Sequence, residues 1–104
     1  MSIYAVTYTY VPETEEMTQT RPAHVDFLGR LHEEGRLLAS GRLTETDPLG
    51  ALLIITGQDV ADVEALMDGD PFYAGGFISE RLVRRWNIAF GVVGALGSEG
   101  NPED

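Results

Sequence analysis

The sequence has no cysteine and no lysine among its 104 residues. Disulfides, thiolate metal sites and cysteine nucleophiles are therefore excluded, as is Schiff-base chemistry on a lysine amine. All seven basic residues are arginine, and 17 acidic residues bring the formal net charge to −10. Such a charge opposes binding to nucleic-acid phosphates and anionic lipids, which clusters of basic residues hold. Two histidines, the carboxylates, the hydroxyls and the arginines remain for chemistry.

Signals for targeting, membranes and nucleotides are missing as well. The first fifteen residues lack the basic start and long apolar run of a targeting segment, and no apolar stretch approaches the roughly 20 residues of a membrane span. Glycine-rich phosphate loops and the Gly-x-Ser-x-Gly elbow are also absent. We therefore expect a single-domain cytoplasmic protein with no cofactor, no nucleic-acid partner and no membrane contact.

Hydrophobic patterning predicts six elements in the order β, α, β, β, α, β. Thr20 before Arg21-Pro22 is typical of an N-cap with proline in the first helical turn, so Glu13 to Thr20 is expected to be a loop. Runs of β-branched residues, glycines and Asp-Pro give the other boundaries. The expected strands are Ile3 to Val11, Arg36 to Leu43, Ala51 to Thr56 and Leu82 to Phe90, the expected helices follow Thr20 and Asp59, and Phe72 to Phe77 is expected to be a connection.

This order predicts an α+β, ferredoxin-like fold, in which a four-stranded antiparallel sheet carries both helices on one face. The strand from Ala51 to Thr56 is apolar on both faces, although helices can cover only one of them. Uncovered apolar faces of this kind usually mark interfaces. We therefore predict a homodimer whose sheets pack face to face.

The end of the chain has a different composition from the rest. Glycine recurs at every third position from Gly91 to Gly100, and the last residues are acidic. Four repeats without flanking proline are too few for a collagen-type helix. We expect residues 1–90 to form the domain and residues 91–104 to be a flexible tail.

His24 is the strongest candidate for chemistry. Its position on the first predicted helix places it close to Leu28 and Leu31 in the apolar stripe. An imidazole in such surroundings is suited to proton transfer near neutral pH. The alternative is a structural core histidine bonded to a carbonyl group.

Two charged residues are candidate partners of this histidine. Asp70, between Gly69 and Pro71-Phe72, could orient an imidazole, or it could only form the turn that ends the second helix. Arg21, one turn before His24, could hold an anionic substrate group, or it could pair with a surface acid.

The second histidine does not indicate a metal site. His32 lies off the buried stripe and eight residues from His24, whereas helical metal ligands are usually four apart. Glu33 and Glu34 do not complete the His-Glu-x-x-His zinc pattern. We expect His32 to be solvated and predict no metal.

Taken together, several short motifs resemble the YciI-like (YCII-related) family over about Ser2 to Phe90. The resemblance implies a ferredoxin-like, dimeric α+β barrel fold, with His24 and Asp70 paired in a cleft. One branch of the family resembles a dehydrochlorinase. Gly41-Arg42 departs from the Gly-Pro of many members, which implies either an altered charge preference in the cleft or an arginine that points to solvent. The motifs are Arg21-x-x-His24, Phe27-Leu28, Leu31, Gly35, Gly41, Asp70-Pro71-Phe72 and Trp86.

These observations favour a cofactor-independent enzyme in which His24 is the general acid/base and Asp70 orients it. The expected chemistry is isomerisation, elimination or lyase chemistry on a small activated molecule such as a phenol, enol or lactone, with Arg21, Tyr8 and Phe72 binding it. A non-catalytic module that binds or senses a small ligand is the first alternative. A cofactor-free monooxygenase-like barrel is the second.

Overall fold

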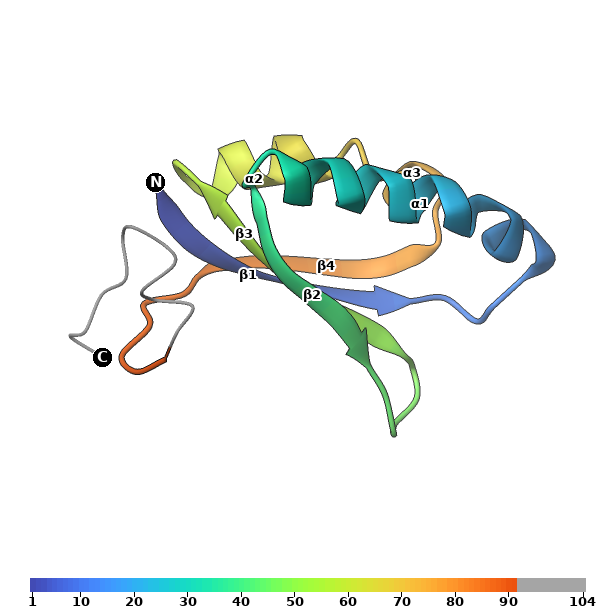
Figure 1. Ribbon diagram of the computed structural model, residues 1–104. Helices are drawn as coiled ribbons and strands as arrows, with labels where there is room; N and C mark the ends of the chain where they lie inside the picture. Colours follow the sequence, from blue (N-terminus) through green and yellow to red (C-terminus); the bar gives the residue numbers. More distant parts are fainter. Residues whose placement is uncertain (92–104) are drawn as a thin grey trace.

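The computed structural model describes residues 1–91, which form one four-stranded antiparallel sheet and three helices (Figure 1). The strands lie in the order β2-β3-β1-β4, with all neighbours antiparallel. The predicted α+β, ferredoxin-like fold is confirmed. The elements are β1 (Ser2–Tyr10), α1 (Glu15–Glu33), β2 (Leu37–Leu43), β3 (Gly50–Gly57), α2 (Val60–Met67), α3 (Pro71–Ala74) and β4 (Ile78–Arg85).

The helices all lie on one face of the sheet, and the main core fills the space between the two layers (Figure 1). The strict alternation of β1 explains this arrangement, because successive side chains of a strand point to opposite faces. Tyr4, Val6, Tyr8 and Tyr10 are buried beneath the helices. Within residues 1–91, no helix is both long and apolar enough to cross a membrane.

Helix α1 begins six residues before the predicted position, at Glu15 rather than Arg21. The Thr14 side chain accepts a hydrogen bond from the Met17 backbone N–H at 3.2 Å, which caps the helix, and the acidic pair Glu15-Glu16 suits the positive end of the helix dipole. The prediction that Glu13 to Thr20 is a loop was wrong because Pro22, a residue that usually opens a helix, here lies inside one. Met17, two turns before His24, is buried in the core, so the turn before this proline is part of the packed helix.

The position of the last strand was also predicted wrongly. It starts at Ile78 and ends at Arg85, whereas the sequence predicted Leu82 to Phe90. Pairing with β1 sets these limits, since Ile78 lies opposite Tyr10 and Arg85 opposite Tyr4. Ser79, Glu80 and Arg81 made the start of this strand hard to recognise in the sequence. They are tolerated there because one face of this edge strand is exposed. The predicted connection over Phe72 to Phe77 contains the short helix α3.

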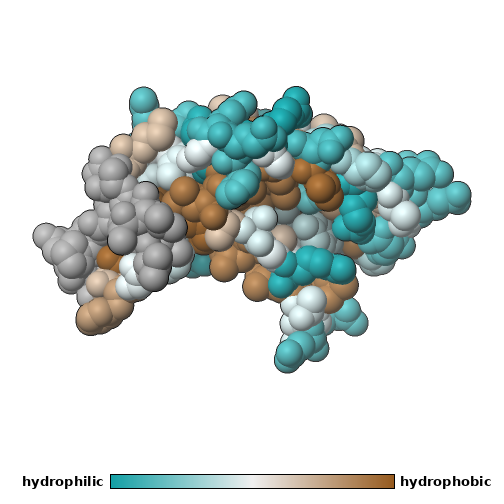
Figure 2. All heavy atoms as spheres, viewed as in Figure 1, coloured by the Kyte–Doolittle hydropathy of each residue, from teal (hydrophilic) through white to brown (hydrophobic). Residues whose placement is uncertain are grey.

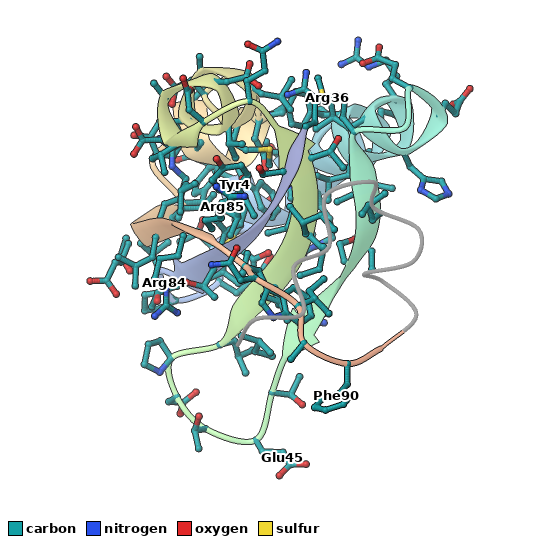
Figure 3. The ribbon with its side chains drawn as sticks, turned by 90° about the vertical axis from the view of Figure 1, so that its left-hand side faces the viewer. Tyr4, Arg36, Glu45, Arg84, Arg85 and Phe90 are labelled. Atoms are coloured by element: carbon teal, nitrogen blue, oxygen red, sulfur yellow. The ribbon has the colours of Figure 1, made fainter. Side chains whose placement is uncertain are left out.

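The face of the sheet without helices, which we call the open face, is partly covered by the chain itself. After β4, Ile88 packs against Ile3 and Ile54, while Phe90 is fully exposed at the bend of this segment (Figure 3). Beyond this contact, Leu43 and Leu82 remain 47% and 45% exposed. The predicted tail, apart from Gly91, lies outside the described residues.

Candidate functional site

Asp70 is a fully buried carboxylate at the junction of α2 and α3. It caps the short helix α3, where its Oδ1 accepts the Phe72 backbone N–H at 2.9 Å. Pro71 fits the first turn of that helix because its fixed φ suits a helix start and its missing N–H costs nothing there. The turn that ends α2 therefore also aims a carboxylate into the core.

His24 reaches this carboxylate from α1. Met17, His24 and Leu31 are spaced by seven residues and are buried on the same side of the helix. The His24 Nδ1 lies 2.8 Å from Asp70 Oδ1, and the imidazole stacks on the Phe72 ring with centroids 4.0 Å apart. The structure thus brings together two side chains that are 46 positions apart.

Tyr8 completes the contacts of the carboxylate. Its hydroxyl donates to Asp70 Oδ2 at 2.9 Å. Burial, together with the negative charge of Asp70, raises the pKa of Tyr8 far above its usual value, so this hydroxyl stays protonated as a donor. Tyr8 was predicted to bind substrate, but the structure directs its hydroxyl to Asp70. Phe72, with the same predicted role, is fully buried and stacks on His24.

These contacts fix the tautomer of His24. Both oxygens of Asp70 accept hydrogen bonds from protein donors, so the carboxylate acts as an acceptor and Nδ1–H of His24 donates to it. The lone pair then lies on Nε2. Among residues 1–91, Nε2 has no hydrogen-bond partner, yet no buried side-chain nitrogen or oxygen is left unpaired. Nε2 is therefore open to solvent and available to a ligand.

Two neighbouring cavities lie on the side of the sheet that carries the helices, and of these two only the smaller is lined by His24. A small cavity of about 120 Å³ lies between α1 and the sheet and includes His24. A larger one of about 530 Å³ lies among the end of β1, the start of α1 and the β2–β3 loop. Tyr10 and Arg42 line both cavities, which makes them the junction between the two. Figure 2 shows apolar side chains exposed between α1 and the sheet on this side of the molecule.

Tyr10 is a site residue that the sequence analysis did not select. Burial and the nearby Asp70 charge raise its pKa, which keeps the phenol protonated. The alternation of β1 places Tyr10 on the same face of the sheet as Tyr8, and this was the sequence pattern from which Tyr10 could have been selected. No sequence pattern indicates the shape of the cavity, because only the fold brings the loop residues Asp47, Pro48 and Leu49 to its outer wall.

Arg21 contacts both a surface acid and the site. Its guanidinium lies 2.6 Å from Glu13 and also sits over the Phe72 ring, 5.3 Å from the centroid. A hydrogen bond from Thr18, followed by the contact with Arg21, lowers the pKa of Glu13. Arg21 lines the larger cavity but already has a carboxylate partner.

His32 is exposed, and its Nδ1 contacts the Leu37 carbonyl at 2.9 Å, away from His24. In the part of the chain from residue 1 to 91, no three His, Cys, Asp or Glu side chains gather as metal ligands do.

Comparison with known sequences identifies a family and two relatives. The model of the YCII-related domain matches residues 2–87. Two proteins named Protein YciI, from Escherichia coli O6:H1 (strain CFT073) and Shigella flexneri, are each 30% identical over 84 residues. The matched part covers 73% of this chain and 86% of each relative.

Solved structures share the fold. A 5-chloro-2-hydroxyhydroquinone dehydrochlorinase from Burkholderia phenoliruptrix AC1100, in complex with 2,5-dihydroxybenzoquinone, has a TM-score of 0.69 at 21% identity, covering 83% of this chain and 94% of that one. An antibiotic biosynthesis monooxygenase has a TM-score of 0.51 at 15% identity, covering 83% and 96%. At these identities the likeness establishes the architecture alone.

Proposed function

The chain belongs to the YCII-related family, and from this premise we propose that it is a cofactor-independent enzyme that transfers protons on a small activated molecule. His24 is the general acid/base, and Asp70 orients it. The observation that carries the proposal is the hydrogen bond between His24 Nδ1 and a fully buried Asp70, with Nε2 open beside a cavity.

The geometry suits proton abstraction followed by proton return. Nε2 takes a proton from a carbon or hydroxyl of the substrate, and the electron pair of the broken bond is delocalised over the substrate's own ring or enol system. Asp70 stabilises the imidazolium that forms. In an isomerisation the proton then returns to a different atom. In an elimination the delocalised pair forms a new π bond, the leaving group departs with the pair of its own bond to carbon, and the imidazolium releases its proton to solvent. A positioned acid/base of this kind typically contributes about 10²- to 10⁴-fold.

Tyr8 and the Phe72 backbone N–H have a supporting role in this scheme. They hold the two oxygens of Asp70, so the carboxylate cannot turn away from the imidazole. Residues that support a catalytic group in this way keep its tautomer and direction fixed. We therefore assign Tyr8 a positioning role.

A hydroxylated ring is the proposed type of substrate. Such a ring delocalises the charge that proton abstraction leaves behind, so the protein needs no cofactor as an electron sink. The dehydrochlorinase with the same fold was found with 2,5-dihydroxybenzoquinone, which supports this type of molecule without identifying the substrate.

The test is ring-proton exchange of 1,2,4-trihydroxybenzene in deuterated buffer, followed by proton NMR and extended to a panel of enols and lactones. We expect the wild-type protein to accelerate exchange by about 10²- to 10⁴-fold and His24→Ala to return it to the rate in buffer. His32→Ala is the matched control, since it removes the exposed histidine of the same helix, and it should keep the wild-type rate.

The outcome also separates the two alternatives. Equal binding of the panel by wild-type protein and His24→Ala, with no exchange or turnover in either, would overturn the enzyme proposal and favour a binding module. Oxygen uptake with a quinol, lost under anaerobic conditions, would instead favour the monooxygenase-like activity.

We also propose that the protein is a homodimer joined through the open face of the sheet. Leu43 and Leu82 leave apolar surface exposed there, and Leu38 and Leu52 are only partly covered by the cluster of Ile3, Ile54 and Ile88. A second copy would cover this surface with an identical one, as two-fold symmetry requires.

A further inference from the structure

Arg42 occupies a distinctive position in the described part of the molecule. It lies on β2 opposite Ala51, and Ala51 lies opposite Tyr8, so Arg42 is on the same face of the sheet as the candidate site. It lines both the small cavity with His24 and the larger outer cavity. Within residues 1–91 its guanidinium forms no ion pair and no hydrogen bond.

The other charges of the larger cavity leave Arg42 available. Glu13 and Arg21 neutralise each other at 2.6 Å. Asp47 also lines the cavity, but in residues 1–91 it is not in an ion pair with Arg42. A ligand that enters the junction between the cavities therefore meets a guanidinium with no direct partner among residues 1–91. Two carboxylates, Glu13 and Asp47, lie on the wall of the larger cavity, and the charge of Arg42 also acts on Glu13.

Tyr10 supplies a second donor at the same junction. Its hydroxyl has no hydrogen-bond partner within the described residues. Tyr10, Arg21 and Arg42 line the same cavity. Burial raises the pKa of Tyr10, whereas the positive charges of Arg21 and Arg42 act in the opposite direction. A protonated hydroxyl and a guanidinium beside one cavity are complementary to an anion with two oxygens.

We propose that Arg42 and Tyr10 form a carboxylate subsite, and that the substrate is an aromatic or enolic carboxylate. Its carboxylate lies at the junction of the two cavities, and its ring lies in the small cavity beside His24 Nε2. Apolar side chains of the larger cavity, including Val11, Met17 and Leu49, receive any further substituent. The direction of the ring rests on the proposed proton-transfer function, but the subsite itself does not.

The experiment compares two probes that differ by one carboxylate, 2,5-dihydroxybenzoate and hydroquinone, by calorimetric and NMR titration. We expect the wild-type protein to bind the carboxylate about ten-fold more tightly than hydroquinone. Arg42→Ala should remove this preference without changing the affinity for hydroquinone. Arg42→Lys should retain part of it, because the charge remains but the two-pronged geometry is lost. Tyr10→Phe should weaken only the binding of the carboxylate.

Arg85→Ala is the matched control, since it removes the same charge from an exposed arginine at the other end of the sheet. Arg85 lies opposite Tyr4 on β4 (Figure 3), and neither cavity includes it. It should keep the wild-type preference. Equal affinity for the two probes, no binding of 2,5-dihydroxybenzoate, or equal losses in Arg42→Ala and Arg85→Ala would overturn the subsite.

Binding is measured without turnover, so failure of the subsite can be told apart from failure of the enzyme proposal. His24→Ala should still prefer the carboxylate, even though it has lost proton exchange. If it loses the preference as well, the carboxylate lies at His24 and the assignment to Arg42 is wrong.

Discussion

Asp70 connects three parts of the molecule through one side chain. The imidazole of His24 from α1, the hydroxyl of Tyr8 from β1 and the Phe72 backbone N–H of α3 all donate to it. A buried carboxylate is costly unless its oxygens are satisfied by hydrogen bonds, and here no buried side-chain oxygen within the described residues lacks a partner. The same contacts that make burial of the charge tolerable also direct the candidate base.

The raised pKa of Tyr8 predicts alkaline sensitivity. In the folded protein, burial and Asp70 keep this phenol protonated, whereas in the unfolded chain it ionises at about pH 10. The unfolded state therefore loses the proton first, and the free energy of unfolding falls as pH rises above about 10, by up to about 1.4 kcal/mol per pH unit. Tyr8→Phe should flatten this dependence while lowering stability at pH 8.

Urea denaturation at a series of pH values between about 8 and 11 measures this slope. Tyr73→Phe, which removes an exposed hydroxyl of α3, is the matched control. Identical slopes for wild-type protein and Tyr8→Phe would contradict the assignment of the alkaline loss to Tyr8.

At the residue scale, periodicity predicted the burial of His24, which the structure shows. The resemblance to the family paired this histidine with Asp70, and the two side chains lie 2.8 Å apart, while their catalytic role stays a prediction. The sequence did not predict the hydrogen bond from the Tyr8 hydroxyl to Asp70 or the position of Tyr10 between the two cavities. Those depend on the sheet register and on where α3 projects Asp70, because the Tyr8 hydroxyl and its partner are 62 positions apart. No local pattern encodes a contact of that range.

At the scale of elements, most boundaries were predicted to within a residue, since β-branched runs and glycines mark them well. Asp59 was identified as the start of the second helix, and its side chain does accept the Asp62 N–H at 2.8 Å. The start of α1 was missed because a strong local signal, Pro22, competed with the cap at Thr14. Burial of Met17 in the core decides between the two, and only the tertiary structure shows it.

The cap of α1 gives a prediction that distinguishes the two helix starts. Thr14→Ala should lower the free energy of unfolding by about 1 kcal/mol, because the Met17 N–H loses its acceptor. Thr20→Ala should cost less than about 0.5 kcal/mol, since Thr20 lies inside the helix and bonds only to the Glu16 carbonyl. Denaturation followed by circular dichroism measures both. A larger loss in Thr20→Ala would contradict the observed start.

At the scale of the whole molecule, the open face determines how copies of the chain associate. Leu82 lies on that face, opposite Thr7 of β1, and a charge there would be buried without a partner in the proposed homodimer. Leu82→Glu should therefore convert the dimer to a monomer, as measured by light scattering after gel filtration.

Val60→Glu is the matched control, because Val60 is a similarly exposed apolar residue on α2, on the side of the sheet that carries the helices. It should leave the molar mass unchanged. A wild-type protein that is monomeric at all concentrations would refute the pairing of open faces.

The hydrogen bond between His24 and Asp70 joins residues from the two halves of the chain. Tyr8 and His24 come before the β2–β3 hairpin, whereas Asp70 and Phe72 follow it, so each half of the chain carries only part of the site. Neither half contains the complete site, and in the folded sheet β3 of the second half lies between β2 and β1 of the first. The proposed reactivity is therefore a property of the whole folded chain, which neither half can supply without the other.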